Sequence, residues 1–260
     1  MEPIIAQQLE REDQTTQTNK PRREVPPEKA TSFFIHQPGK RTANTYGGDR
    51  DKSGAPHQQA GIQAGNLLVQ RRYAWRGYQL PAVRQDPNLF AFLAYDEGQL
   101  VGTVSVRLDS EEGLSADELY PKEVGALRSL NHRVCEFTRL AVDSAAATKA
   151  VLAGLFHTAY LYAAIVRSYT HAVIEVNPRH VGFYSTGLQF ECIGGERLNK
   201  RVNAPATLLC VAFATIAAGI AKYAGRPEVP GARHSLFLYG FPSNEEAGVL
   251  NRLRALVHVN

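Results

Sequence analysis

Residues 173–190, "VIEVNPRHVGFYSTGLQF", decide the fold that we predict for this chain. The stretch begins with apolar residues that are typical of a buried strand, and it turns polar at Asn177. Pro178 follows at the position that proline favours at the start of a helix, and Gly187 is typical of a residue just past a helix end. The stretch therefore predicts a strand that leads directly into a short helix.

A second stretch with the same pattern lies upstream, at residues 134–143, "VCEFTRLAVD". It also runs from apolar into polar residues where a strand would end. The segment that follows, "SAAATKAVLAGLFHTAYLYAAIVRS", is rich in alanine and has apolar residues on most faces, which predicts a long and largely buried helix.

The rest of the chain supplies further strands and helices. Residues 90–110, "FAFLAYDEGQLVGTVSVRLDS", read as a hairpin that turns at "DEGQ". Ser115 is a capping residue that opens a helical segment with acidic residues in its first turn. We expect strands at 190–197 and 207–213, and helices at 61–77, 216–225 and 243–258. This order predicts an α/β fold of the α+β type, with a mixed sheet and helices on both faces.

The first 58 residues differ in composition from the rest. They are rich in Gln, Thr, Lys, Arg, Pro and Glu, and they contain few apolar clusters. Such a segment buries too little surface to offset the entropy of ordering it. We predict a disordered tail over residues 1–58, with one short strand at Ser32–His36, and a folded domain over residues 59–260.

Charge and cysteine content narrow the classes of function. The net charge of +4 is too weak to indicate nucleic-acid binding. Cys135, Cys192 and Cys210 have no metal-ligand or disulfide spacing, and all three are predicted to be small core residues. No signal peptide is apparent, and we read the apolar residues 204–220 as a buried strand that runs into a helix. A cytoplasmic protein without a transmembrane segment or bound metal is expected.

The order of these elements resembles the GNAT acyltransferase fold. Within that fold the chain is similar to the FeeM-type N-acyl amino acid synthases, which are relatives of the acyl-homoserine-lactone synthases. The stretches that carry this resemblance are "RRYAWRGY", "GTVSVRLDSEEGLSADELY", "VCEFTRLAVD", "VIEVNPRHVGFYSTGLQF" and "RVNAPATLL". They cover about residues 66–212, and "EFTRLAV" followed by "NPRHVGFY" is the most specific part.

The resemblance implies that an amine attacks an acyl thioester and forms an amide. It implies a fatty acyl donor on acyl carrier protein, with an amino acid such as tyrosine as acceptor. Glu136, a carboxylate inside an apolar strand, is the candidate general base; its alternative role is an ion pair with Arg107 or Arg139. Tyr184 is the candidate acid that protonates the leaving thiolate, or else a packing aromatic.

Further candidates bind the substrates. Arg139 is expected to bind the acceptor carboxylate, if a β-bulge of the kind the resemblance implies turns it toward Glu136. Asn177 is a candidate ligand of the pantetheine amide, or else bonds the splayed backbone at the strand end. His180 is a candidate base or substrate ligand, or else a residue of the helix surface. Arg72 and Trp75, on the predicted helix at 61–77, are implied to form part of the acyl and acceptor sites; a solvated basic face is the alternative.

The sequence also bears on the donor. GNAT enzymes that use coenzyme A carry a glycine-rich turn whose backbone N–H groups hold the pyrophosphate. The corresponding turn here, "VDSAAATKAVLAG", has no glycine before the helix. A carrier protein with a single phosphodiester on its phosphopantetheine arm fits this turn better than coenzyme A, and no permanently bound cofactor is expected. A basic rim for the acidic carrier would comprise Lys149, Arg197, Lys200 and Arg201, although such charges are often plain solvated surface.

Two rival functions remain. One is an acetyl-coenzyme A-dependent N-acetyltransferase, against which the missing glycine-rich turn counts. The other is a catalytically silent scaffold that binds carrier protein or lipid. No serine or cysteine lies in a nucleophile-elbow pattern such as G-x-S-x-G, so we expect direct attack without an acyl-enzyme.

Overall fold

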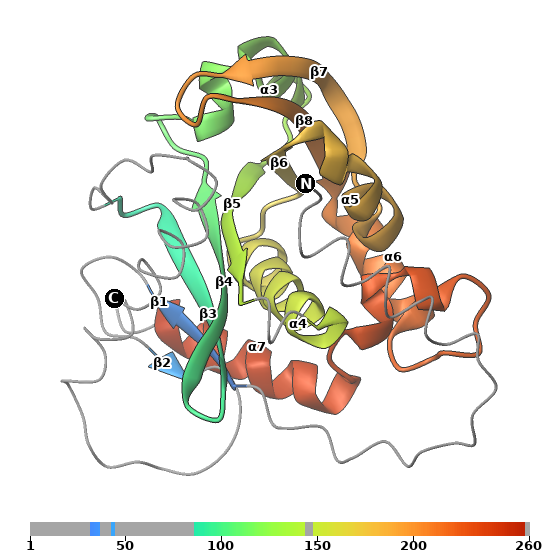
Figure 1. Ribbon diagram of the computed structural model, residues 1–260. Helices are drawn as coiled ribbons and strands as arrows, with labels where there is room; N and C mark the ends of the chain where they lie inside the picture. The colour runs from blue at the N-terminus through green and yellow to red at the C-terminus, as the bar shows by residue number, and fades with distance from the viewer. Residues whose placement is uncertain (1–31, 37–42, 45–85, 144–147, 258–260) are drawn as a thin grey trace.

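The computed structural model describes residues 32–36, 43–44, 86–143 and 148–257. Their strands form one mixed sheet in the order β2-β1-β3-β4-β5-β6-β8-β7 (Figure 1). The bounds are β1 Ser32–His36, β2 Ala43–Asn44, β3 Leu89–Asp96, β4 Gln99–Leu108, β5 Val134–Val142, β6 His171–Val176, β7 Glu191–Asn199 and β8 Ala204–Ala212.

Two strands come from the segment that we predicted to be a tail. The strand expected at Ser32–His36 is confirmed, and it pairs antiparallel with β3. The two-residue strand at Ala43–Asn44 was not predicted, and it pairs with β1 at the edge of the sheet. The predicted disorder elsewhere in residues 1–58, and the domain boundary at residue 58, lie outside the described residues and stay predictions.

The predicted hairpin is confirmed as β3 and β4. Glu97 and Gly98 connect the strands with φ angles of 49° and 77°. Two successive positive φ angles are the mark of a type I′ turn, whose twist matches that of the strands that it joins. β4 also pairs antiparallel with β5, which joins the hairpin to the centre of the sheet.

The central strands β5 and β6 are parallel, and they pair over only three positions. These are Val134 with His171, Cys135 with Ala172, and Glu136 with Val173. Beyond this point each strand continues without pairing with the other, β5 to Val142 and β6 to Val176. The backbone groups of the two strands are therefore unpaired with one another just after Glu136.

The expected β-bulge is present in β5. The register between β4 and β5 shifts between Thr103 and Ser105, which pair with Ala141 and Thr138 respectively. Arg139 lies in the skipped part of β5 and has a left-handed φ of 54°. An inserted residue of this kind breaks the alternation of the strand and redirects its side chain.

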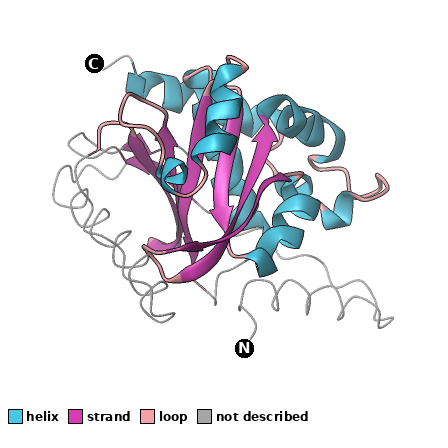
Figure 2. Ribbon diagram, turned by 90° about the horizontal axis from the view of Figure 1, so that it is seen from above, coloured by secondary structure: helices cyan, strands magenta, loops and turns pink. Residues whose placement is uncertain are grey.

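One face of the sheet carries the larger hydrophobic core and most of the helices (Figures 1 and 2). The predicted long helix is confirmed as α4 Lys149–Tyr160, which continues as the π-helix η2 Leu161–Val166. The other helices that pack here are α5 Val181–Leu188, α6 Phe213–Tyr223, η5 Leu236–Tyr239 and α7 Ser243–Val257. Two short helices lie beside them, η3 Pro178–His180 next to α5 and η4 Ala232–His234 next to η5.

The opposite face carries a smaller core beneath η1 Ser115–Glu118 and α3 Pro121–Ser129. Tyr120 is fully buried there, and its hydroxyl donates to the carbonyl of Ala206 at 2.6 Å. Arg128 holds the layer in place through bidentate bonds to Asp109 and Asp117. This layer forms the wall that the side chain of Glu136 meets.

Three details of the sequence prediction were wrong. Ser115 is the first residue of η1 and not its cap, which is Leu114. Gly187 lies inside α5, and the helix ends at Leu188 with Gln189 in the left-handed conformation at φ 59°. Glutamine therefore adopts the cap geometry for which glycine is favoured. Cys192 is exposed, whereas Cys135 and Cys210 are buried as expected. Cys192 lies on the edge strand β7, whose outer side chains face solvent.

Residues 204–220 form β8 and the start of α6, as predicted. Among the described residues one helix, Lys149–Val166, is long and apolar enough to cross a membrane, but 72% of it is buried inside the protein. Its apolar surface is used by the larger core, which is the ordinary reason for a helix of this composition in a folded domain.

Candidate active site

Glu136 is buried on the face of the sheet that η1 covers. Strand alternation directs its neighbours Cys135 and Phe137 into the larger core and Glu136 to the other side. Only 3% of the residue is exposed, and its Oε2 accepts a hydrogen bond from the backbone N–H of Ser115 at 2.7 Å. Its Oε1 has no hydrogen-bond partner within the described part of the chain.

The structural role considered for Glu136, an ion pair with Arg107 or Arg139, is not formed. Arg107 pairs instead with Asp86, at 2.8 Å between Nη2 and Oδ2. Burial raises the pKa of Glu136, and the negative charge of Glu175 adds to the rise. The pKa reaches about 7, although the N–H of Ser115 and the positive charges of Arg107 and Arg201 act in the opposite direction. A carboxyl with a pKa near neutrality is suited to accept and release a proton.

Glu175 is a second carboxylate on the same face, which the sequence analysis missed. It lies on β6 two residues after Val173, the pairing partner of Glu136. Its Oε2 accepts from Asn199 Nδ2 at 2.6 Å, and its Oε1 is 3.4 Å from Arg201 Nη2. The signal was available, because Glu175 interrupts an apolar strand just as Glu136 does.

Tyr184 lies in the larger core, on the opposite face of the sheet from Glu136. Its ring packs edge-on against Phe156, Phe183 and Phe190, with centroid distances of 6.1, 5.1 and 5.9 Å. The packing role is therefore present. A role in protonating a thiolate requires the donor to pass between β5 and β6, from the side of Tyr184 to that of Glu136.

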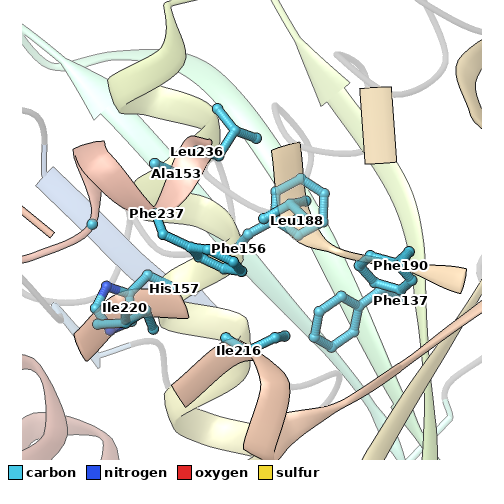
Figure 3. Close-up of a pocket in the computed structure, with 11 residues that line it drawn as sticks. Phe137, Ala153, Phe156, His157, Leu188, Phe190, Ile216, Ile220, Leu236 and Phe237 are labelled. Atoms are coloured by element: carbon cyan, nitrogen blue, oxygen red, sulfur yellow. The ribbon is translucent and has the colours of Figure 1, made fainter. Parts of the chain in front are cut away.

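An apolar cavity of about 20 Å³ lies among α4, α5, α6 and η5 (Figure 3). Phe137 of β5 and Phe190 lie at one side of it, while His157 and Ile220 lie at another. His157 is a buried histidine whose Nδ1 accepts from the N–H of Phe241 at 3.0 Å. Its Nε2 lies 3.2 Å from Oε2 of Glu246 but makes no hydrogen bond among the described residues. The cavity has room for about one water molecule.

The predicted substrate ligands take different positions. Arg139 is partly exposed at the bulge of β5. Asn177 caps the start of η3, where its Oδ1 accepts from the N–H of Arg179 at 3.3 Å. His180 is partly exposed at the end of η3. Arg72 and Trp75 lie outside the described residues.

The four residues predicted to form a basic rim are not gathered on one face. Arg197 makes a bidentate ion pair with Glu123 of α3, and Arg201 is 3.2 Å from Glu118 of η1. Lys200 is exposed in the turn between β7 and β8. Lys149 begins α4, which covers the opposite face of the sheet.

This mixed sheet, with its two central strands diverging beside a buried glutamate, belongs to the GNAT class of acyltransferase folds. The family model of the "N-acyl amino acid synthase FeeM" matches residues 64–212, which is more than half of the chain. The chain therefore belongs to the FeeM family, and it is an N-acyltransferase. No curated protein matches it.

The chain is also similar to several solved structures. FeeM from uncultured soil microbes is 28% identical, with a TM-score of 0.55 over 62% of this chain and 88% of FeeM. A putative N-acetyltransferase from Lactobacillus plantarum is 16% identical, with a TM-score of 0.46 over 71% and 99% of the two chains. The coenzyme A-dependent acyl-homoserine lactone synthase BjaI is 16% identical, with a TM-score of 0.44 over 62% and 78%.

Proposed function

We propose that the protein transfers a long-chain fatty acyl group from acyl carrier protein to the amine of an amino acid. The observation that carries the proposal is the buried Glu136, whose pKa is raised to about 7 where β5 and β6 cease to pair. Membership of the FeeM family supports the reaction class. The cytoplasm, where a carrier protein would supply the donor, is the proposed location.

The proposed reaction needs one proton acceptor and one proton donor. Ionised Glu136 takes a proton from the acceptor ammonium, and the free amine then attacks the thioester carbonyl carbon. A C–N bond forms as the C–S bond breaks, and Tyr184 is the proposed donor of the proton that the leaving thiolate needs. Tyr184 regains its proton from the nitrogen of the forming amide, and Glu136 releases its proton to solvent. The sum is one amide, one thiol and one proton.

The diverging strands and the apolar cavity support the donor part of the proposal. Backbone groups of β5 after Glu136 and of β6 after Val173 do not pair with one another, so they are available to the amides of a phosphopantetheine arm. Phe137 links this place to the cavity. The cavity is too small for an acyl chain as it stands, so the side chains that line it must move apart when the chain enters.

We propose a carrier protein as the donor in preference to coenzyme A, because of the missing glycine-rich turn. Thr148 also caps α4, where its hydroxyl accepts from the N–H of Val151 at 3.2 Å. That N–H is then not directed at a phosphate. Since glutamates already balance Arg197 and Arg201, the carrier-binding role is proposed mainly for Lys200, which is exposed in the turn between β7 and β8.

The donor is tested by comparing two thioesters of the same fatty acid, one on acyl carrier protein and one on coenzyme A. The purified protein is mixed with each thioester and a set of amino acids, and thiol release is followed together with amide formation. We expect a higher kcat/KM with the carrier protein. Faster reaction with the coenzyme A thioester would favour the rival acetyltransferase type of donor, and binding without amide would favour the silent scaffold.

The acyl pocket is tested with a matched pair of alanine-to-leucine changes. Ala153 lines the cavity, whereas Ala218 is exposed on α6. Ala153→Leu fills the cavity, so we expect the preferred acyl chain to become shorter, with no such change in Ala218→Leu. An unaltered chain-length profile in Ala153→Leu, in a protein that remains folded, would place the acyl chain elsewhere.

A further inference from the structure

Arg107 lies directly beside the buried glutamate. It is the residue of β4 that pairs with Glu136 of β5 across the antiparallel ladder. Residues that face each other in this way have Cα atoms about 4.5–5.5 Å apart and side chains on the same face. A positive and a negative side chain therefore project side by side from the floor of the site.

The guanidinium of Arg107 is only partly used. Its Nη2 pairs with Asp86, but its Nε is buried and has no hydrogen-bond partner within the part of the chain that the structure describes. Buried donors without a partner are rare in native proteins, and each one calls for an explanation. The nearest carboxylate across the ladder, Glu136, is not bonded to it. A ligand oxygen is the natural partner for such a donor.

We propose that Arg107 binds the carboxylate of the acceptor while Glu136 faces its ammonium group. This inference rests on the proposed function, and it specifies the acceptor as a free α-amino acid. The two charged groups of an α-amino acid are separated by a single carbon, which suits two side chains on adjacent strands. Arg139, the residue that the sequence favoured for this role, lies three positions further along β5, at the bulge.

The inference predicts that replacing Arg107 weakens the binding of an acceptor with a carboxylate and spares an acceptor without one. The probes are an amino acid and the amine left when its carboxylate is removed, for example tyrosine and tyramine. In Arg107→Gln we expect the KM for the amino acid to rise about 10- to 100-fold, as for loss of one charge-assisted hydrogen bond. The KM for the amine should stay within about 2-fold, because that acceptor has no carboxylate to lose.

Asp86→Asn is the matched control, because it removes the present partner of Arg107 and leaves the guanidinium in place. We expect its KM for the amino acid to be unchanged or lower. If Arg107→Gln and Asp86→Asn instead slow both acceptors equally and lower the melting temperature alike, the pair is structural and the inference is wrong. Arg107→Lys, which keeps the positive charge, provides a second test if Arg107→Gln does not fold; it should show the same selectivity in weaker form.

Two further outcomes separate this inference from the proposed function. Arg139→Gln, and not Arg107→Gln, could selectively raise the KM for the amino acid. The carboxylate would then bind at the bulge, and the inference would fail while the proposed function stands. If the wild-type protein acylates neither probe from any donor, the proposed function itself fails.

Discussion

Replacing Glu136 by glutamine should remove the reaction and at the same time stabilise the protein above neutral pH. Glutamine has the shape of a protonated glutamate, and its carbonyl oxygen can still accept from the N–H of Ser115. What it lacks is the negative charge that burial disfavours. The change therefore isolates the cost of ionising this side chain inside the protein.

The magnitude follows from the pKa of Glu136, which is raised from 4.5 to about 7. Between these values the folded state holds the proton more tightly than the unfolded chain does. The free energy of unfolding of the wild type therefore falls as the pH rises from about 4.5 to about 7, and it is level above that. At about 1.36 kcal/mol for each pH unit, the total is about 3 kcal/mol.

Urea unfolding of the wild type and Glu136→Gln at pH 5 and pH 8 measures this difference. The variant should gain nearly the full amount at pH 8, or roughly 6–12 °C in melting temperature, and much less at pH 5. Glu123→Gln is the control, for which the stability change at pH 8 should have the opposite sign. The ion pair of Glu123 with Arg197 lowers the pKa of Glu123. That variant should lose stability at pH 8. A Glu136→Gln protein that is less stable than the wild type at pH 8 would refute the reasoning.

Two further predictions concern the pH profile and the packing of α6. Because only ionised Glu136 accepts a proton, kcat/KM for the acceptor should fall as the pH drops below about 7. Glu175→Gln removes a negative charge and should move the midpoint of this fall to lower pH. A pH profile that does not move in Glu175→Gln would contradict the coupling of the two carboxylates. Gly219→Ala should cost about 1–3 kcal/mol in a thermal melt, since a Cβ there would lie 2.3 Å from Phe237. In Gly182→Ala, where the space is open, stability should hold or rise by about 0.4–1 kcal/mol; similar losses in both would contradict this.

The parts of the fold that were predicted correctly are those that local patterns determine. The hairpin follows from alternation around a turn at Glu97 and Gly98, and the long helix follows from its apolar, alanine-rich composition. The end of α5 was misplaced because the choice between Gly187 and Gln189 depends on how the last turn packs, where a left-handed glutamine is tolerated. The expected bulge at Arg139 came from the family resemblance, since nothing in the local pattern requires it.

The site was harder to predict, because it depends on which strands are neighbours. Glu136 was found as a carboxylate in an apolar strand, and its predicted burial is confirmed. Its relation to Glu175 and Arg107 requires the pairing of β4, β5 and β6, which a sequence alone does not give. For the same reason the sequence did not show that Tyr184 and Glu136 lie on opposite faces of the sheet.

Mass spectrometry of a single reaction tests the central claim most directly. Purified protein is incubated with long-chain acyl carrier protein and an equimolar mixture of amino acids, beside an identical reaction with Glu136→Gln. The account predicts a new N-acyl amino acid, formed in step with free thiol, in the wild-type reaction and its near absence in the variant. An intact thioester with folded wild-type protein, for both carrier-protein and coenzyme A donors, would contradict it.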